Sequence, residues 1–160
     1  ENIFLHVRRG SPNLTGRRGE KWSYQMIQDY HPLCKKEYYL NSLKQFPEDK
    51  TVIVVSDTID WCKEQDWLQN DRFLFSDSSY ETFGDGASVP YIDLCLMSLC
   101  GAIIANSSLS WWGAWLQGDS GKVVVPDPWF GSAYSHYNMK DMIPDRWIKI
   151  YNDPTPIEIE

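Results

Sequence analysis

The chain has 160 residues, 42% of them hydrophobic and 23% charged, so a single domain with a substantial buried core is expected. Its formal net charge of −7 and isoelectric point near 4.9 argue against a nucleic acid or an anionic membrane as the main partner. Positive charge is concentrated in residues 8–21, where an anionic small molecule would have to bind.

Four cysteines stand at positions 34, 62, 95 and 100, without the spacing of a metal site. Three of them, Cys62, Cys95 and Cys100, lie among apolar residues, which predicts buried thiols in a reducing compartment and no bound metal. No signal peptide and no membrane-length apolar run are evident. A cytoplasmic location, or the cytoplasmic membrane face if the protein is bacterial, is therefore expected.

The N-terminal half alternates strands and helices. Ile3–Val7 is predicted as a strand, Leu33–Phe46 as a helix and the β-branched run Thr51–Ser56 as a buried parallel strand. Asp57 and Thr58 are placed to cap a helix over Ile59–Leu68.

The C-terminal half continues the alternation. A short strand Arg72–Phe75 leads through a polar loop to a helix over Pro90–Cys100 and a buried strand Gly101–Ala105. A further helix follows, then a strand Lys122–Val125 closed by Pro126. A short helix near Lys140 and a possible edge strand Trp147–Tyr151 are predicted in the tail.

This order of elements predicts an α/β fold with a doubly wound, parallel, Rossmann-like sheet. Ligands of such sheets bind at the carboxyl ends of the strands. The residues expected at those ends should therefore converge on one crevice: His6–Arg9, Ser56–Asp57, Ser76–Asp77, Asn106–Ser110 and Pro126–Trp129.

The turn after Ala105 has the character of an anion site. Asn106, Ser107 and Ser108 carry side chains suited to cap the next helix, and unpaired N–H groups at a helix start attract negative charge. A nucleotide diphosphate would fit there, with Ser110 one turn along the helix. Trp111 and Trp112 belong to a set of packing rings, and one of them is expected to face the ligand.

Arg8 and Arg9 follow one another on a strand, so their side chains point to opposite faces and one of them is expected to enter the crevice. A guanidinium there could bind a phosphate and neutralise a diphosphate leaving group, whereas the other arginine would be an ion-pair partner. A solvated basic loop is the alternative. His6 shares the face of Arg8 and is either a base, an orienting group or a packed core residue.

Two carboxylates need an explanation. Asp57 could accept hydrogen bonds from a guanine edge or a ribose, or could simply cap its helix. Asp93 stands amid apolar residues, where it could meet an arginine or reach a sugar.

Several segments together resemble the family 11 glycosyltransferases, the α-1,2-fucosyltransferases. They are His6-Val7-Arg8-Arg9-Gly10, Val55-Ser56-Asp57, Asp93-Leu94, Ile103-Ile104-Ala105-Asn106-Ser107-Ser108 with Ser110-Trp111-Trp112-Gly113-Ala114-Trp115, Trp129-Phe130 and Ile143-Pro144 to Trp147-Ile148. The similarity runs over almost the whole chain, and the Asn106–Trp115 block is its most specific part.

The resemblance implies transfer of fucose from GDP-fucose to a galactose-containing glycan, with inversion and without a metal or other cofactor. It implies that residues 1–160 are the donor-binding half of a B-type glycosyltransferase fold whose N-terminal acceptor domain is absent. By position, His6, Arg8 and Arg9 would be the diphosphate motif, whereas Ser56, Asp57 and Asn106–Ser110 would line the donor site. Ser11 departs from the family's usual aspartate, so a non-catalytic nucleotide-sugar or carbohydrate-binding domain is the alternative function.

Overall fold

Within the described residues, six strands form one parallel sheet at the centre of the domain. In a computed structural model, residues 2–9, 23–76 and 90–155 are described. The strands are β1 (Ile3–Val7), β2 (Val52–Ser56), β3 (Phe73–Phe75), β4 (Gly101–Ile103), β5 (Val123–Asp127) and β6 (Ile148–Tyr151). Their order is β3-β2-β1-β4-β5-β6, and every pair is parallel. The predicted doubly wound, Rossmann-like α/β fold is confirmed, with its switch point between β1 and β4.

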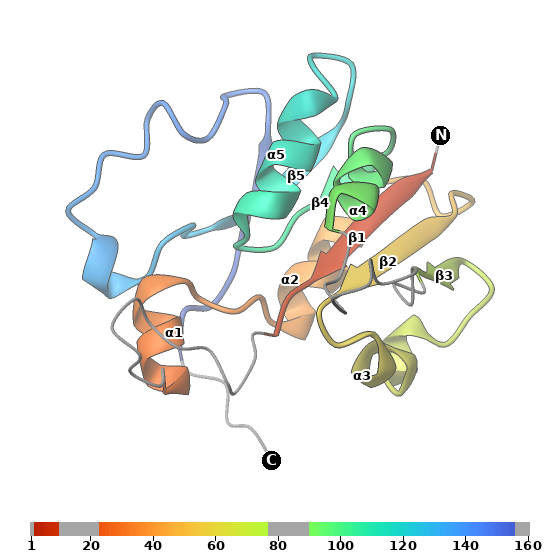
Figure 1. The fold of residues 1–160 in the computed structure, drawn as a ribbon, viewed down its shortest axis with the longest axis horizontal. Helices are drawn as coiled ribbons and strands as arrows, with labels where there is room; N and C mark the ends of the chain where they lie inside the picture. Colours follow the sequence, from red (N-terminus) through yellow and green to blue (C-terminus); the bar gives the residue numbers. More distant parts are fainter. Residues whose placement is uncertain (1, 10–22, 77–89, 156–160) are drawn as a thin grey trace, which may run out of the picture.

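Helices cover both faces of the sheet (Figure 1). They are α1 (Tyr24–Tyr30), α2 (Lys36–Leu43), α3 (Ile59–Lys63), η1 (Asp66–Leu68), α4 (Pro90–Met97), α5 (Ser108–Leu116) and η2 (Ser132–Tyr134). Alternation along the strands produces two cores: Leu5 of β1 packs with Tyr38 of α2 on one face, whereas Phe4 packs with Met97 of α4 on the other. Residues that follow β1 are therefore divided between two faces.

Element boundaries differ from prediction where local signals were overridden. The helix expected over Ile59–Leu68 divides into α3 and η1, and α1 was not predicted at all. Strand β5 continues through Pro126 to Asp127, because its β4 partner pairs only as far as Val124 and the missing N–H interrupts no bond on that side. The helix expected near Lys140 is wrong, since turns occupy that position.

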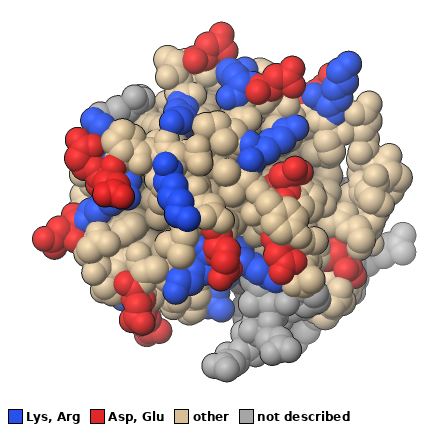
Figure 2. Space-filling view, turned by 180° about the vertical axis from the view of Figure 1, so that it is seen from behind, with Lys and Arg blue, Asp and Glu red and all other residues tan. Residues whose placement is uncertain are grey.

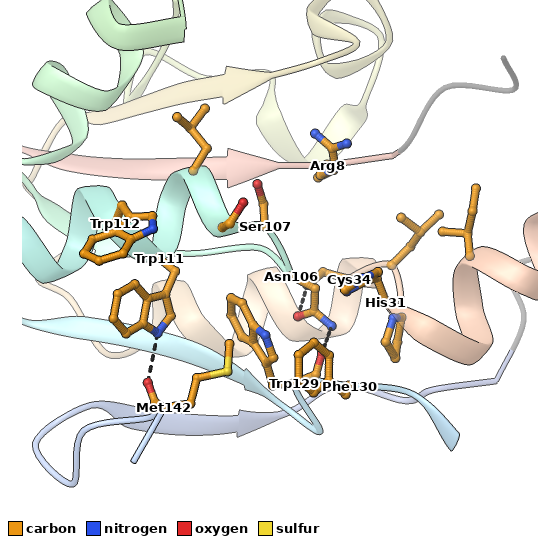
Figure 3. Close-up of a pocket in the computed structure, with 15 residues that line it drawn as sticks. Arg8, His31, Cys34, Asn106, Ser107, Trp111, Trp112, Trp129, Phe130 and Met142 are labelled. Carbon is orange, nitrogen blue, oxygen red and sulfur yellow. Dashed lines mark hydrogen bonds between the residues drawn. The ribbon is translucent and has the colours of Figure 1, made fainter. Parts of the chain in front are cut away.

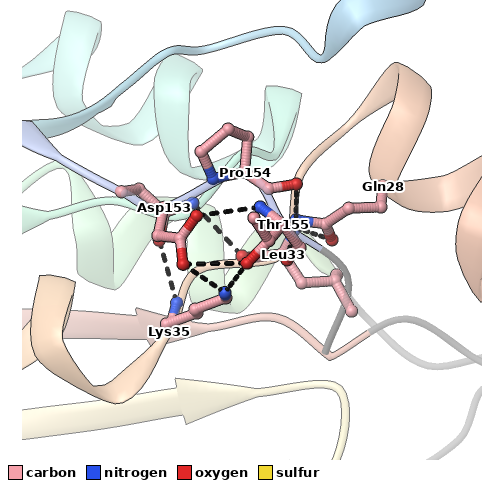
Figure 4. A network of polar contacts seen from close by, with 7 residues as sticks. Gln28, Leu33, Lys35, Asp153, Pro154 and Thr155 are labelled. Atoms are coloured by element: carbon pink, nitrogen blue, oxygen red, sulfur yellow. Dashed lines mark hydrogen bonds and ion pairs between the residues drawn. The ribbon is translucent and has the colours of Figure 1, made fainter. Parts of the chain in front are cut away.

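The segment after β6 ties the sheet edge to the connection between α1 and α2 (Figure 4). Lys35 Nζ lies 2.7 Å from Asp153 Oδ2, and this contact lowers the pKa of Asp153 to about 2. The Lys35 N–H donates to Asn152 Oδ1 at 2.9 Å, and the Gln28 amide donates to the Pro154 carbonyl at 2.9 Å. These bonds hold the C-terminal end of α1 at the carboxyl edge of the sheet.

Charge on the face opposite to that of Figure 1 is mixed, with basic and acidic side chains interspersed (Figure 2). None of the helices in the described ranges has the length and apolar content needed to cross a bilayer. Of the cysteines, Cys34, Cys62 and Cys100 are buried, whereas Cys95 is exposed on α4. The predicted burial of Cys95 is therefore wrong: apolar neighbours in the sequence do not decide which side of a helix faces the sheet.

Candidate functional site

A cavity of about 640 Å³ opens at the carboxyl ends of β1, β4 and β5 (Figure 3). Predicted residues from three strand ends meet in its lining: Arg8 after β1, Asn106, Ser107 and Ser108 after β4, and Trp129 after β5. Ser56, at the end of β2, and Ser76, after β3, are not in the lining. The expected crevice therefore exists, and three of the five expected strand ends contribute to its described lining, whereas Asp77 lies outside the described residues.

Arg8 and Arg9 lie on different sides of the end of β1. Arg8 lines the cavity, whereas the Arg9 guanidinium lies over the Trp61 ring, 4.0 Å from its centroid. One arginine in the cavity is what strand alternation predicts. The ion pair, however, was expected for the arginine outside the cavity. It is Arg8, in the lining, that lies 4.0 Å from Asp57 Oδ2, whereas Arg9 makes a cation–π contact.

Asp57 joins the ends of β1 and β2. Its Oδ1 accepts a hydrogen bond from the Arg9 N–H at 3.0 Å, and its Oδ2 lies near Arg8. Neither Ser56 nor Asp57 lines the cavity, and the Ser56 hydroxyl accepts the Thr58 N–H at 3.0 Å. The Thr58 side chain makes no capping bond to α3, so that predicted cap is wrong. Asp57 sits where it can orient Arg8 toward the cavity.

His6 is buried beneath Arg8, with 3% of its surface exposed. Burial, followed by the charge of Arg8, lowers the pKa of His6 from 6.5 to about 4, so the imidazole is neutral at pH 7. Its Nδ1 has no hydrogen-bond partner in the described part of the chain. His6 does not line the cavity, and the packed-core alternative describes its position best.

The turn after β4 uses its polar side chains internally. The Asn106 amide donates to the Trp129 carbonyl at 2.8 Å, and its Oδ1 accepts the Cys34 thiol at 3.8 Å. Ser107 is the N-cap of α5 but makes no side-chain capping bond, so the predicted hydroxyl cap is wrong. The first N–H groups of α5 therefore receive no side-chain acceptor from Ser107, and the first residues of the helix, Ser108 and Leu109, line the cavity.

Ser110 lies one turn into α5 and is fully buried. Its hydroxyl donates to the carbonyls of Ala105 at 3.3 Å and Ser107 at 3.2 Å, and the residue is not in the cavity lining. It stabilises the turn rather than facing a ligand.

Two tryptophans of α5 form part of the cavity wall. Trp111 stacks on Trp115 at 5.3 Å between centroids and donates its Nε1–H to the Met142 carbonyl at 3.0 Å. Trp112 also lines the cavity and is 52% exposed. Both rings line the cavity. The sequence predicts that one of them faces a ligand, and either ring is placed to do so.

Asp93 lies away from the cavity. Its Oδ1 accepts the Ser76 hydroxyl at 3.4 Å, and burial raises the pKa of its carboxyl while this bond opposes the rise. The contact links the first turn of α4 to the residue that follows β3.

Sequence patterns did not predict the histidine in the lining. His31, the C-cap of α1, is half-buried and lines the cavity together with Arg8 (Figure 3). Burial, followed by the charge of Arg8, lowers the pKa of His31 below 6.5. Its ring makes edge contacts with Phe130 and Tyr134, at 5.5 and 5.8 Å between centroids. Only the docking of α1 brings this histidine to the strand ends.

In the described ranges, no group of three or more His, Cys, Asp or Glu side chains could hold a metal ion. The cavity instead combines a guanidinium, a helix start and aromatic walls. Together with the strand order, these features define a Rossmann-like domain whose cavity suits a ligand that joins an anionic group to an aromatic or apolar one.

The sequence profile described as "Glycosyl transferase family 11" matches residues 2–151. The chain therefore belongs to glycosyltransferase family 11, as the sequence segments indicated. It is 37% identical over 139 residues to an alpha-1,2-colitosyltransferase of Escherichia coli, a match that covers 84% of this chain and 45% of the relative.

A second relative is the O-antigen biosynthesis glycosyltransferase WbnK of Escherichia coli, which is 31% identical over 151 residues. That match covers 91% of this chain and 43% of the relative, so the chain spans less than half the length of both relatives. No solved structure shows a significant match to the chain.

Proposed function

We propose that this chain is the donor-binding half of an inverting, metal-independent α-1,2-fucosyltransferase that uses GDP-fucose and a galactoside acceptor. One observation carries the proposal: Arg8 and the first residues of α5, Ser108 and Leu109, line the same cavity. Two independent sources of positive potential directed at one space suit a diphosphate. The family membership supports the transferase reaction. The fucosyl group, the guanine base of the donor and the α-1,2 linkage are proposed in addition.

The chemistry requires a leaving group and a base. The acceptor hydroxyl oxygen attacks the anomeric carbon while the bond from that carbon to the diphosphate oxygen breaks, so GDP departs with the electron pair. Arg8 and the N–H groups of α5 stabilise the charge that develops on the diphosphate. The hydroxyl proton passes to a base, and His31 is the candidate because its neutral imidazole lines the cavity.

His6, on the face of Arg8, is the other histidine near the end of β1. It is almost fully buried and therefore has no access to an acceptor hydroxyl, so its proposed role is support of the strand end beneath Arg8.

Calorimetric titration of the folded chain with GDP, GDP-fucose, UDP and ADP tests the donor site. GDP and GDP-fucose are expected to bind in preference to the other nucleotides. A folded sample that binds none of them would remove the donor-site proposal, and a preference for UDP or ADP would remove its guanine part.

Turnover separates the transferase from the alternative, a non-catalytic nucleotide-sugar or carbohydrate-binding domain. The assay requires the longest native protein that contains this chain, because the relatives are more than twice the length of the matched region. Transfer from GDP-fucose, or from a colitosyl donor as the name of one relative suggests, to a β-galactoside is the expected result. Donor binding without transfer to any acceptor would favour the binding domain.

A further inference from the structure

A second hollow, of about 530 Å³, adjoins the cavity across a shared wall. Trp129 and Phe130 belong to the lining of both spaces. The second hollow lies at the carboxyl ends of β5 and β6, and Asp29 of α1 also belongs to its lining. A ligand in one space is thus separated from a ligand in the other by two side chains.

The two spaces differ in charge. Arg8 is the charged residue in the described lining of the first cavity, whereas Asp29, Asp127 and Lys149 are those of the second. Two carboxylates against one ammonium group disfavour a diphosphate in the second hollow. Ionised carboxylates accept hydrogen bonds and donate none, so they favour a ligand rich in hydroxyl groups.

Aromatic rings give the second hollow an apolar side. Phe130, Tyr134 and Tyr137 form a connected cluster, with centroids 5.0 Å apart for the first pair and 5.1 Å for the second. Tyr137 is 54% exposed. A flat ring with an apolar face and a hydroxyl suits a ligand that is apolar on one side and polar along its edge.

This wall is held rigidly against α1. The Tyr134 ring packs edge-on against Tyr30 at 4.9 Å, and the Gly131 N–H donates to the Tyr30 carbonyl at 3.2 Å. A Cβ atom at Gly131 would stand 2.3 Å from the Asp29 carbonyl oxygen, so only glycine permits this approach. The hollow therefore exists before any ligand arrives, which lowers the ordering cost of binding.

We propose that the second hollow binds an uncharged pyranose unit of the glycan acceptor. The pyranose presents a C–H face to Tyr137 and its hydroxyl edge to Asp127 and Asp29. This inference rests on the proposed function: it gives the donor-binding half a subsite for one acceptor unit, across the shared wall from the donor cavity, in addition to the acceptor domain that the family resemblance implies. His31 lines the first cavity, and its ring contacts Phe130 and Tyr134, which line the second hollow, so the imidazole lies beside the shared wall.

NMR titration of the isotope-labelled chain with methyl β-galactoside tests the site. Millimolar binding is expected, with shift changes centred on residues 127–137. Tyr137→Ala and Asp127→Asn should each weaken binding at least fivefold. Tyr151→Ala is the matched control, because Tyr151 is 70% exposed on β6 and does not line the hollow.

A parallel titration with GDP distinguishes this inference from the proposed function. GDP binding without galactoside binding, or galactoside binding that Tyr137→Ala and Asp127→Asn leave unchanged, would overturn the second site alone. Galactoside shifts centred on Trp111 and Trp112 would also overturn it. Galactoside binding at residues 127–137 without GDP binding would support the second site and remove the donor proposal.

Discussion

The cavity has two corners, one at the end of β1 and one at the end of β4. Polar residues follow both strands, but the two corners contribute different groups to the cavity. The corner after β1 directs a charged side chain, Arg8, into the space, with Asp57 beside it. In the corner after β4, the side chains of Asn106 and Ser110 make internal hydrogen bonds, and the backbone N–H groups at the start of α5 are the groups proposed to bind a ligand. Polar residues at a strand end therefore need not be ligand groups, because some of them build the turn that presents the backbone.

The largest effect is expected beneath the first corner, at His6. Its folded pKa of about 4 lies below the unfolded value of 6.5, so the unfolded state binds the proton first as the pH falls. Between pH 6.5 and 4 the free energy of unfolding should drop by about 3 kcal/mol from this group. Denaturant unfolding at pH 7 and pH 4 measures the drop, which His6→Leu should remove. Equal drops in both proteins would contradict it.

Arg8→Ala tests the charged side chain of the first corner. Removal of a guanidinium that makes charge-assisted bonds to a diphosphate should weaken GDP binding about 100-fold. Arg9→Ala removes the same charge from the neighbouring position, over Trp61, and should weaken binding less than fivefold. Calorimetry of the three proteins checks this, and equal losses in both variants would reduce the role of Arg8 to general charge.

Asn106→Ala tests whether the second corner is structural. The change removes bonds to the Trp129 carbonyl and the Cys34 thiol, so the free energy of unfolding should fall by about 2 kcal/mol. GDP affinity of the folded variant should change less than threefold at a temperature well below its melting point. Lost GDP affinity with unchanged stability would show that the amide contacts the ligand.

Ser108→Pro tests the backbone contribution. Ser108 is the first residue of α5, where proline is well tolerated, and Ser107 before it is extended at φ −143° and ψ 130°. The helix should persist while one N–H is lost, and GDP should bind about tenfold more weakly. Ser108→Ala keeps the N–H and is the control. Unchanged affinity of the proline variant in calorimetry would exclude this N–H as a phosphate donor.

Much of the architecture was predictable because buried strands have strong local signals. The runs around Leu5, Val54 and Val124 are apolar and β-branched, and all three form parallel strands. Helix α1 escaped prediction because its seven residues carry no clear apolar period, and its position depends on contacts with the segment after Phe130. His31 and the second hollow depend on the position of α1, so they were not predictable from the sequence either.

Three features follow from backbone periodicity and can be predicted from the sequence: the parallel sheet, the strand ends that carry polar residues and the opposite directions of Arg8 and Arg9. Which polar groups face the cavity depends instead on how the elements pack together. The Asn106 amide donates to the carbonyl of Trp129, 23 residues further along the chain. His31 lies at the strand ends because hydrogen bonds join residues 28–35 to residues 152–155. Because the hydrogen-bond partners of these polar groups lie far away along the chain, the local sequence does not show whether a given group binds a ligand or another part of the protein.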